Sequence, residues 1–530
     1  MSSSLLRRIR IIFSTIVLIL FILLFIDFKA IIPSDFFKSL TFLQFIPSVM
    51  KFMGTKTILA GGFLIVLLIT LLTGRTYCSF LCPLGIAQDL TSRIGGKIRK
   101  KFRRYGFKKP FTILRYALLA ITLIVTMIWG IYMITLLDPY GIFARFMTYF
   151  AKPVVIVLNN FLARILGKFD IYTLSNVTLK SFPLIVYAIP AAFFLLIGGL
   201  SLTKGRLYCN MFCPLGTFLG LISKVSFLRI QFDESACTRC GRCAVRCKSS
   251  CIDFLKADVD VSRCVGCFNC VHICQENAIS YKKAIFKEKK PDTVKPKKEE
   301  VHKTDESRRK ILVGTVLLLF GITKISSGQN KTAPKPKKDS TVRETKTFPV
   351  CPPGGLSIRD FNRDCTACSL CINACPNGVL QPSYRQYGIA GMMQPVMDYH
   401  ISFCTYNCTK CTEVCPTNAL HPLALDAKKL TQLGKAKFIK DNCIVKTEKT
   451  NCGACSESCP TKAVHMIPYE GNLVIPEVTD DICVGCGHCE YACPTVPYKA
   501  IYVDGNPVHM AAKKPVNVES DIKTPVDFPF

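Results

Sequence analysis

Four long apolar runs dominate the first part of the chain. Each run, with its flanking residues, approaches the ~20 residues that a helix needs to cross the hydrocarbon core of a membrane. The pattern therefore predicts four membrane-spanning helices. They cover approximately residues 11–32, 58–72, 111–137 and 183–200.

Basic residues gather on one side of these runs. Arg7, Arg8 and Arg10 precede the first run, and the loop 93–109 is strongly basic with no acidic residue. The positive-inside rule places both segments in the cytoplasm, which predicts a multi-pass protein of the bacterial inner membrane. A net charge of +32 with a mean hydropathy of +0.31 excludes an ordinary soluble enzyme. Nucleic-acid binding is not expected, because the basic residues lie in loops beside apolar runs.

One motif occurs twice in this region. Gly-Arg-x-Tyr-Cys-x3-Cys-Pro-Leu-Gly stands at 74–85 and again at 205–216, each time after the second helix of a pair. This repeat predicts a duplicated two-helix unit that makes residues 1–229 a four-helix membrane domain. Cysteines four positions apart share one face of a helix, so the two halves can bring four thiolates together. The candidate metal ligands are Cys78, Cys82, Cys209 and Cys213.

Four convergent thiolates suit an iron–sulfur cluster or a single soft metal ion. A redox-active thiol pair and a purely structural role are the alternatives. Arg75 and Arg206, which belong to the same motif, are interpreted as interfacial anchors whose charged heads reach toward water. Asp138 precedes a proline and is interpreted as part of a helix-terminating turn, with acceptance of a quinol proton as the alternative.

Several cofactors are not expected. All seven histidines lie outside the four apolar runs, which excludes a haem held by two histidines inside the membrane. No G-x-G-x-x-G sequence follows a predicted strand, and no P-loop lysine is present, so neither flavin nor NAD is expected.

The remaining cysteines form six groups of four. Four groups have the full C-x2-C-x2-C-x3-C spacing of bacterial [4Fe–4S] ferredoxins, and the other two lengthen only the first gap. Dense triplets of cysteine disfavour disulfides and zinc sites, so the spacing predicts six [4Fe–4S] clusters in α+β ferredoxin modules. Each group is named here by its first residue. The groups are Cys237, Cys240, Cys243 and Cys247; Cys264, Cys267, Cys270 and Cys274; Cys365, Cys368, Cys371 and Cys375; Cys404, Cys408, Cys411 and Cys415; Cys443, Cys452, Cys455 and Cys459; and Cys483, Cys486, Cys489 and Cys493.

The first two groups predict a two-cluster module at residues 230–282, directly after the fourth apolar run and therefore cytoplasmic. In such a module three cysteines of one group share a cluster with the fourth cysteine of the other group. Cys274 thus joins group 237, and Cys247 joins group 264. Cys251 makes the fourth ligand ambiguous, and Lys248 stands where a proline usually follows the fourth cysteine.

A basic linker (283–306), a short apolar segment (307–327) and a Lys/Pro-rich linker (328–350) lead to the last four groups, in a domain at 351–530. Ser-Arg-Arg-x-Ile-Leu at 307–312 is similar to a twin-arginine export signal, which carries folded, cofactor-loaded domains across the membrane. We therefore expect the last domain to be periplasmic, with the uncleaved segment as a fifth span. The alternative is a basic anchor that leaves the domain in the cytoplasm.

The two Cys-x3-Cys-Pro motifs and the first module resemble NapH, the membrane quinol-dehydrogenase subunit of periplasmic nitrate reductase systems, with the NosR and CcoG polyferredoxins as wider relatives. From Ser307 onward the chain resembles NapG, the periplasmic four-cluster partner. The chain thus looks like a NapH–NapG fusion. The resemblance implies oxidation of quinol from the membrane pool and delivery of electrons to a periplasmic reductase or c-type cytochrome.

The resemblance also implies a ligand pairing that cysteine spacing alone leaves open. The outer two of the last four groups would exchange their fourth cysteines, and so would the inner two. The implied sets are Cys365, Cys368, Cys371 and Cys493; Cys483, Cys486, Cys489 and Cys375; Cys404, Cys408, Cys411 and Cys459; and Cys443, Cys452, Cys455 and Cys415.

Six clusters without a substrate motif predict an electron carrier rather than a free-standing enzyme. A cytoplasmic electron donor is the alternative to quinol, and a CcoG-like assembly factor that reduces metals or thiols is the alternative function. One difficulty follows from the topology: the first module and the last domain face opposite sides of a hydrocarbon core that is ~30 Å thick. A deeper location of the Cys-x3-Cys-Pro site, a bridging quinone, or a cytoplasmic last domain would each resolve it.

Overall fold

The computed structural model describes residues 3–27, 32–98, 105–107, 109–129, 132–180, 182–284 and 342–514. These residues belong to one compact unit, built from the chain up to Ala284 and from Val342 onward. The twin-arginine-like segment, the basic linker almost entirely and most of the Lys/Pro-rich linker lie outside the described residues.

The described chain up to Val225 contains helices joined by loops, and its described residues form no strand. Its apolar runs form helices because a helix satisfies its backbone groups internally, as an apolar environment requires. The helices are α1 (Ser3–Ile26), α2 (Ser34–Phe42), α3 (Phe45–Thr55), α4 (Gly62–Thr73), α5 (Tyr77–Phe80), α6 (Pro83–Ile98), α7 (Thr112–Trp129), α8 (Tyr132–Leu137), α9 (Pro139–Phe146), α10 (Lys152–Gly167), α11 (Leu184–Lys204), α12 (Leu207–Met211) and α13 (Pro214–Ile222). Short turns of other helical types are η1 (Ile58–Ala60), η3 (Met147–Ala151) and η4 (Ser223–Val225).

Three described helices are long and apolar enough to cross a membrane: Leu5–Ile26, Pro139–Gly167 and Leu184–Lys204. The first and third agree with two of the four predicted spans. The other two predicted spans form shorter apolar helices, α4 and Thr112–Ile128 of α7. The prediction of four spans therefore differs from the structure in two places, and it omits the long helix from Pro139 onward.

Polar residues explain why that long helix was not predicted. Arg145 and Lys152 interrupt its apolar run, yet both side chains are buried. The Arg145 guanidinium donates hydrogen bonds to the carbonyl oxygens of Thr135 and Gly141, at 2.7 and 3.1 Å. A charged residue that is satisfied inside the protein does not prevent a helix from being apolar on its outer surface.

The first cysteine module is a small α+β unit. Strands β1 (Leu228–Phe232) and β4 (Ile279–Lys283) pair antiparallel and enclose two short helices, each beginning beside the third cysteine of its group. These helices are α14 (Arg242–Arg246) and α15 (Asn269–Ile273), and a second small ladder joins β2 (Ile252–Asp253) to β3 (Asp258–Val259).

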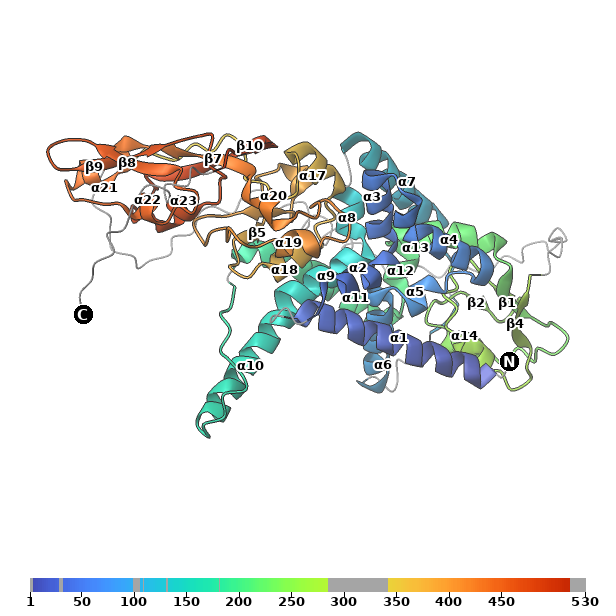
Figure 1. The fold of residues 1–530 in the computed structure, drawn as a ribbon. Coiled ribbons are helices and arrows are strands. Elements are labelled where there is room, and N and C mark those ends of the chain that lie inside the picture. The colour runs from blue at the N-terminus through green and yellow to red at the C-terminus, as the bar shows by residue number, and fades with distance from the viewer. Residues whose placement is uncertain are drawn as a thin grey trace, which may run out of the picture. The chain divides into compact units, whose positions relative to one another are not determined.

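The last domain repeats this plan with more irregular chain between its elements. Its antiparallel pairs are β5–β6, β7–β10 and β8–β9, and β7–β10 is the longest ladder (Figure 1). The helices are α17 (Ile358–Asp364), α18 (Leu370–Ala374), α19 (Lys410–Glu413), α20 (Leu425–Lys429), α21 (Ile444–Thr447), α22 (Ala454–Glu457) and α23 (His488–Ala492), with η5 (Ile389–Gly391) and η6 (Lys440–Asn442). The strands are β5 (Leu380–Pro382), β6 (Pro395–Met397), β7 (Thr431–Phe438), β8 (Val464–Pro468), β9 (Val474–Val478) and β10 (Ile501–Ala511).

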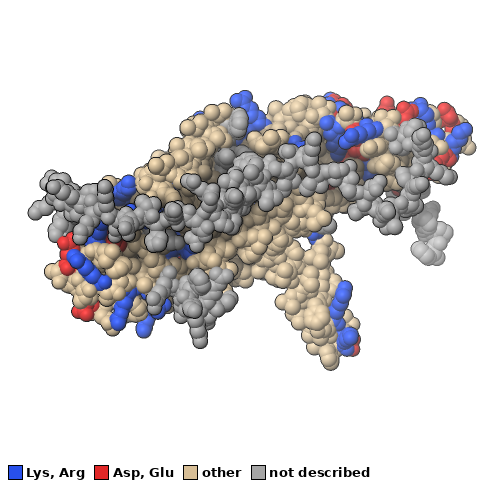
Figure 2. Space-filling view, turned by 180° about the vertical axis from the view of Figure 1, so that it is seen from behind, with Lys and Arg blue, Asp and Glu red and all other residues tan. Residues whose placement is uncertain are grey.

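The core of the last domain contains many cysteines among its aliphatic and aromatic side chains. Most of its cluster-type cysteines are buried, and the others are half-buried. The helical region, in contrast, exposes many large apolar side chains on α1, α4, α7, α10 and α11. Figure 2 shows wide areas of this face without charged side chains. Such an apolar surface is typical of helices that contact lipid.

Candidate iron–sulfur centres

The two Cys-x3-Cys-Pro motifs fold in the same way. Helices α4 and α11 end at a glycine with positive φ, Gly74 at 78° and Gly205 at 68°, which a side chain would strain. A short helix then carries the first cysteine, and the proline after the second cysteine begins the next helix. Proline suits this position because its ring presets the first helical turn and it lacks the N–H that would remain unpaired.

The four cysteines of these motifs come together. Cys78, Cys82, Cys209 and Cys213 are all buried, and their thiols are close enough to interact electrostatically with one another. Among the described residues, no three of these sulfur atoms lie within 4.8 Å of one another. A tetrahedral zinc ion with bonds of 2.3 Å needs sulfur atoms ~3.8 Å apart. The thiols are therefore not preset at the spacing of a tetrahedral ion, and the set can hold an iron–sulfur cluster or a single soft metal ion.

Two arginines bind this site in a reciprocal way. The Arg206 guanidinium donates to the carbonyl oxygen of Cys78 at 2.8 Å, and the Arg75 guanidinium donates to that of Cys209 at 3.2 Å. Both arginines are fully buried. The interpretation as anchors reaching toward water is therefore wrong: each arginine holds the cysteine turn of the other half.

Asp89 on α6 is the acid that balances this positive charge. Its carboxylate pairs with Arg10 at 2.7 Å, Arg206 at 2.8 Å and Lys248 at 3.3 Å. Sequence reasoning did not select Asp89. The sequence held one indication of this charge network. Lys248 stands where a proline is expected after the fourth cysteine of a group. With Arg75 included, the site keeps an excess of positive charge, which favours bound thiolates.

The first module brings Cys247 to group 264. Thiols of Cys264, Cys267 and Cys270 interact electrostatically with Cys247, the arrangement that the crossed ligand rule describes. Cys251 lies beside this set, with its sulfur 3.5 Å from that of Cys247. In group 237, Cys243 interacts with Cys237 and Cys240.

The last four groups pair as neighbours along the chain. Cys375 lines one cavity with Cys404, Cys408 and Cys411. The thiol of Cys415 interacts with those of Cys365, Cys368 and Cys371. Groups 365 and 404 therefore exchange their fourth cysteines.

Groups 443 and 483 exchange theirs in the same way. Cys493 lines a cavity with Cys443, Cys452 and Cys455. Cys459 interacts with Cys483, Cys486 and Cys489.

This arrangement corrects the pairing that the family resemblance implied. The structure does not join the outer groups to each other or the inner groups to each other. The physical reason is that groups next to each other in sequence share one small fold, with a short chain between them, so their fourth cysteines reach across locally. Closing a short loop also costs less entropy than closing one that spans the whole domain.

Burial disfavours the thiolate form of several of these cysteines. It raises the pKa of Cys404 to about 11 and that of Cys455 to about 12. Thiolate is the form that ligates iron, so cluster binding releases protons from these sites. The four-thiol sets, their burial and the two cavities together fit [4Fe–4S] clusters, whose ligands are cysteine thiolates.

The last domain contacts the helical region through group 365. The Tyr149 hydroxyl is 3.1 Å from that of Ser369, and Lys152 donates to the carbonyl oxygen of Asn373 at 3.0 Å. Lys180 donates to the carbonyl oxygens of Ile372 and Cys375. Two lysines from the helical region thus hold the turn that carries Cys371 and Cys375.

Asp138 has a role close to the one predicted. Its carboxylate accepts hydrogen bonds from the backbone N–H groups of Tyr140 and Gly141, at 3.3 and 2.8 Å, and so caps the beginning of α9. The aspartate begins a helix rather than only ending one, with Pro139 in the first turn.

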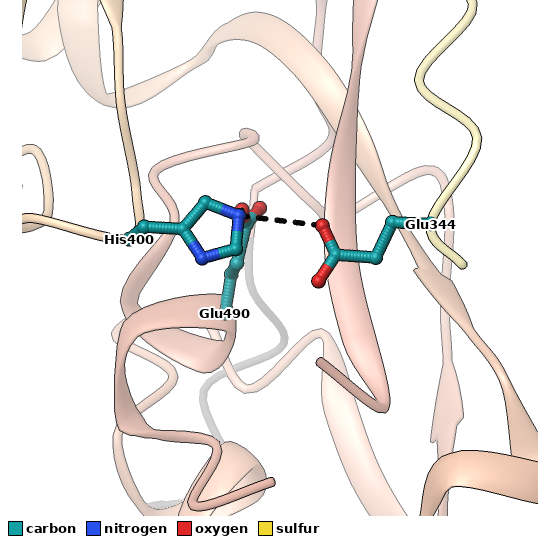
Figure 3. Close-up of side chains that lie close together, drawn as sticks. All are labelled: Glu344, His400 and Glu490. Carbon is teal, nitrogen blue, oxygen red and sulfur yellow. Dashed lines mark ion pairs between the residues drawn. The ribbon is translucent and has the colours of Figure 1, made fainter. Parts of the chain in front are cut away.

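A pair of glutamates, Glu344 and Glu490, lies beside group 483. Figure 3 shows His400 between Glu344 and Glu490, with its Nε2 at 3.4 Å from Glu344 and 3.7 Å from Glu490. Lys346 also pairs with Glu490, at 2.6 Å. Desolvation by burial raises the pKa of Glu490 despite these cations. Because Lys346 already pairs with Glu490, we interpret the cluster as a clamp on the segment 342–350.

Two family models match this chain. The "4Fe-4S binding domain" model matches residues 57–104 and 187–231, which contain the two Cys-x3-Cys-Pro motifs. The "4Fe-4S dicluster domain" model matches residues 364–419, which contain groups 365 and 404, and residues 450–496, which contain group 483 and the last three cysteines of group 443. Iron–sulfur cluster binding is therefore supported in both the helical region and the last domain.

The curated relatives are distant. They include an uncharacterized protein of Methanocaldococcus jannaschii, 24% identical over 36% of this chain and 65% of that protein. The putative electron transport protein YccM of Escherichia coli is 27% identical over 34% and 44% of the two chains. The methylamine utilization ferredoxin-type protein MauN of Paracoccus denitrificans is 24% identical over 36% and 53%. The chain spans about half to two thirds of the length of these relatives. No solved structure gives a significant match. The chain is thus similar to ferredoxin-type electron transport proteins.

Proposed function

We propose that this protein passes electrons from quinol or a cytoplasmic carrier to a periplasmic reductase or c-type cytochrome, and that electrons from the cytoplasmic carrier cross the membrane through its clusters. The finer model is a NapH-like membrane domain joined to a NapG-like four-cluster domain. Clusters bound at the six cysteine groups and at the Cys-x3-Cys-Pro site would each accept and pass on one electron.

The observation that carries the proposal is the pair of contacts at the two ends of α1. Near its beginning, Leu6 packs against the core of the first module. At its end, the carbonyl oxygen of Phe25 accepts a hydrogen bond from Asn373 of the last domain, at 2.9 Å. The two contacts are nineteen residues apart, ~28 Å along a helix of 1.5 Å rise per residue. A candidate membrane span thus separates the first module from the last domain by about the thickness of a hydrocarbon core.

The Cys-x3-Cys-Pro site supports the proposal because it occupies the interval between these ends. Phe80 of the first motif packs against Phe13 of α1, with ring centroids 6.0 Å apart. Farther along α1, Phe25 packs against Tyr140, which interacts electrostatically with Cys368 of the last domain. A cluster at this intermediate depth would divide the distance between the first module and the last domain into shorter electron-transfer steps. The separation of the two by the hydrocarbon core is then no obstacle to transfer.

The direction across the membrane follows from charge. Arg7, Arg8 and Arg10 lie at the end of α1 that contacts the first module. By the positive-inside rule this end is cytoplasmic, so the last domain is periplasmic. A twin-arginine-like sequence before the last domain agrees with this direction.

The test uses the full chain, purified and reconstituted without oxygen, in liposomes. Iron counting should give about 28 irons, seven clusters of four. A menaquinol analogue should reduce the clusters seen by electron paramagnetic resonance, and the last domain should then reduce a cytochrome c added outside.

The matched variants are Cys209→Ser, in the Cys-x3-Cys-Pro site, and Cys351→Ser, at a buried cysteine that belongs to none of the groups. Cys209→Ser should lose about four irons and stop transfer between the two sides, whereas Cys351→Ser should do neither. Undiminished transfer in Cys209→Ser would overturn the intermediate role. Reduction by a low-potential ferredoxin but not by quinol would identify the donor as a cytoplasmic carrier and remove quinol from the proposal.

A further inference from the structure

A cavity of about 450 Å³ lies where the helical region meets the last domain. Its volume falls within the ~300–1,000 Å³ range of small-molecule sites. Apolar side chains make most of its wall, among them Phe37, Ile156 and Leu179. None of the sites described above uses it.

One wall of this cavity belongs to a cysteine set. Cys375 and Cys408 line it, and both belong to the set that Cys404 and Cys411 complete. A molecule bound here would touch the ligand shell of that centre. Contact with a redox centre distinguishes the cavity from a pocket that only holds lipid.

The opposite wall comes from candidate membrane spans. Asp27 directly follows Leu5–Ile26, and Thr148, Lys152 and Ile156 belong to Pro139–Gly167. Because one span ends at the cavity and another runs past it, its occupant can enter from the lipid phase. A water-soluble cofactor would need no such route.

The polar groups of the wall suit a neutral ring with hydroxyl groups. Lys152 and Lys180 each donate to carbonyl oxygens of α18, yet an ammonium group has three donors, so each can also bond an oxygen of a ligand. The Asp27 carboxylate accepts the backbone N–H of Ile32 at 2.9 Å, and its two oxygens offer about four acceptor positions in all. A carboxylate at this position disfavours a phosphate and favours a hydroxyl donor.

We propose that this cavity binds the head group of a membrane quinol, with Asp27 as acceptor and Lys152 and Lys180 as donors to its oxygens. The inference rests on the proposed function and names the site at which quinol is bound. It places that site at the last domain, on the opposite side of the membrane from the first module.

The test is direct binding of a fluorescent quinol analogue, heptyl-hydroxyquinoline N-oxide, to the full chain in nanodiscs. Leu179→Trp fills the cavity from an exposed loop position and should weaken binding about tenfold or more, equivalent to ~1.4 kcal/mol. Asp27→Asn should weaken it to a smaller extent, because it removes only the charge of the acceptor. Ile171→Trp is the matched control, an exposed apolar residue of the same loop that does not line the cavity.

Unchanged affinity in Leu179→Trp would overturn the site. If that variant still bound the analogue while quinol reduced its clusters, the proposed function would stand and only the site would be wrong. If wild-type protein failed to bind the analogue and yielded an anionic phospholipid on extraction, the cavity would be a lipid site. If quinol reduced no cluster in any variant yet the analogue bound with the expected pattern, the proposed function would fail and the site would survive as an inhibitor site.

Discussion

The guanidinium of Arg206 and the carbonyl oxygen of Cys78 lie 2.8 Å apart, although they belong to opposite halves of the repeat. The same guanidinium pairs with Asp89 at 2.8 Å. One side chain therefore joins a cysteine turn to the buried acid of the site. Because Arg75 makes the corresponding bond in the other direction, neither half can complete its cysteine turn alone.

Arg206→Lys should abolish cluster binding at the Cys-x3-Cys-Pro site. A lysine has one nitrogen and cannot reach the aspartate and the carbonyl oxygen together, so one buried group stays unpaired. We expect a loss of about four irons and of ~2–4 kcal/mol of stability, measured by iron analysis and thermal melting. Arg164→Lys, at an exposed position on α10, is the control and should change neither. Full iron content in Arg206→Lys would contradict the shared role of the two halves.

The cysteine pairing predicts a pattern in double variants. If Cys365 and Cys415 hold one cluster, Cys365→Ala and the double variant Cys365→Ala/Cys415→Ala should each lose about four irons. The double variant Cys365→Ala/Cys493→Ala should lose about eight, because its cysteines belong to different clusters. A loss of about four irons in Cys365→Ala/Cys493→Ala, and of about eight in Cys365→Ala/Cys415→Ala, would support the pairing of outer groups that the family resemblance implied.

Lys428 should set the potential of the centre held by group 404. Its ammonium donates to the carbonyl oxygens of Thr405 and Tyr406 and interacts with the thiol of Cys404. Reduction adds negative charge, so removal of this cation should disfavour the reduced form. Lys428→Met should lower the midpoint potential by about 40 mV, equivalent to ~1 kcal/mol for one electron. Potentiometric titration would measure this, and Lys429→Met, which removes a more exposed charge, should give a much smaller shift.

His509 should make the last domain sensitive to moderate acid. Burial lowers the pKa of its imidazole to about 4, below the ordinary 6.5, although a hydrogen bond with the backbone of Cys351 opposes this shift. Below pH 6.5 the imidazole is protonated in the unfolded chain but not in the folded domain. The free energy of unfolding therefore falls as the pH drops from 6.5 to 4. The loss should reach at most about 3 kcal/mol.

His509→Leu should remove this dependence. The apparent melting temperature of the last domain would then stay nearly level from pH 6.5 to 4.5, measured in the full chain with its clusters loaded. His465→Leu, at an exposed histidine on β8, is the control and should keep the wild-type slope. Equal slopes in wild type and His509→Leu would contradict a neutral buried imidazole.

The sequence by itself determined which residues take part in cluster binding. Short-range spacing was sufficient, because three thiolates of one loop surround one cluster whatever the rest of the fold does. The repeat of Cys-x3-Cys-Pro was also visible, since proline and glycine fix the local turn in both copies. These features depend on neighbours in sequence and need no knowledge of distant contacts.

The tertiary structure decided what each residue faces. Asp89 has an ordinary sequence context, and only the approach of Arg10, Arg206 and Lys248 from three other elements makes it the centre of the charge network. The apparent snorkelling of Arg75 and Arg206 was an interpretation from polarity near an apolar run. Their true partners lie more than a hundred residues away, in the other half of the repeat.

Ligand pairing and the route between the two domains were likewise beyond the sequence. The even spacing of the last four groups permits several exchanges of the fourth cysteine, and only folding brings Cys415 to group 365 and Cys493 to group 443. The contacts at the two ends of α1 are also long-range. Spacing reports which atoms can bind iron, whereas the distance between centres depends on how helices pack, and packing is decided by the whole chain.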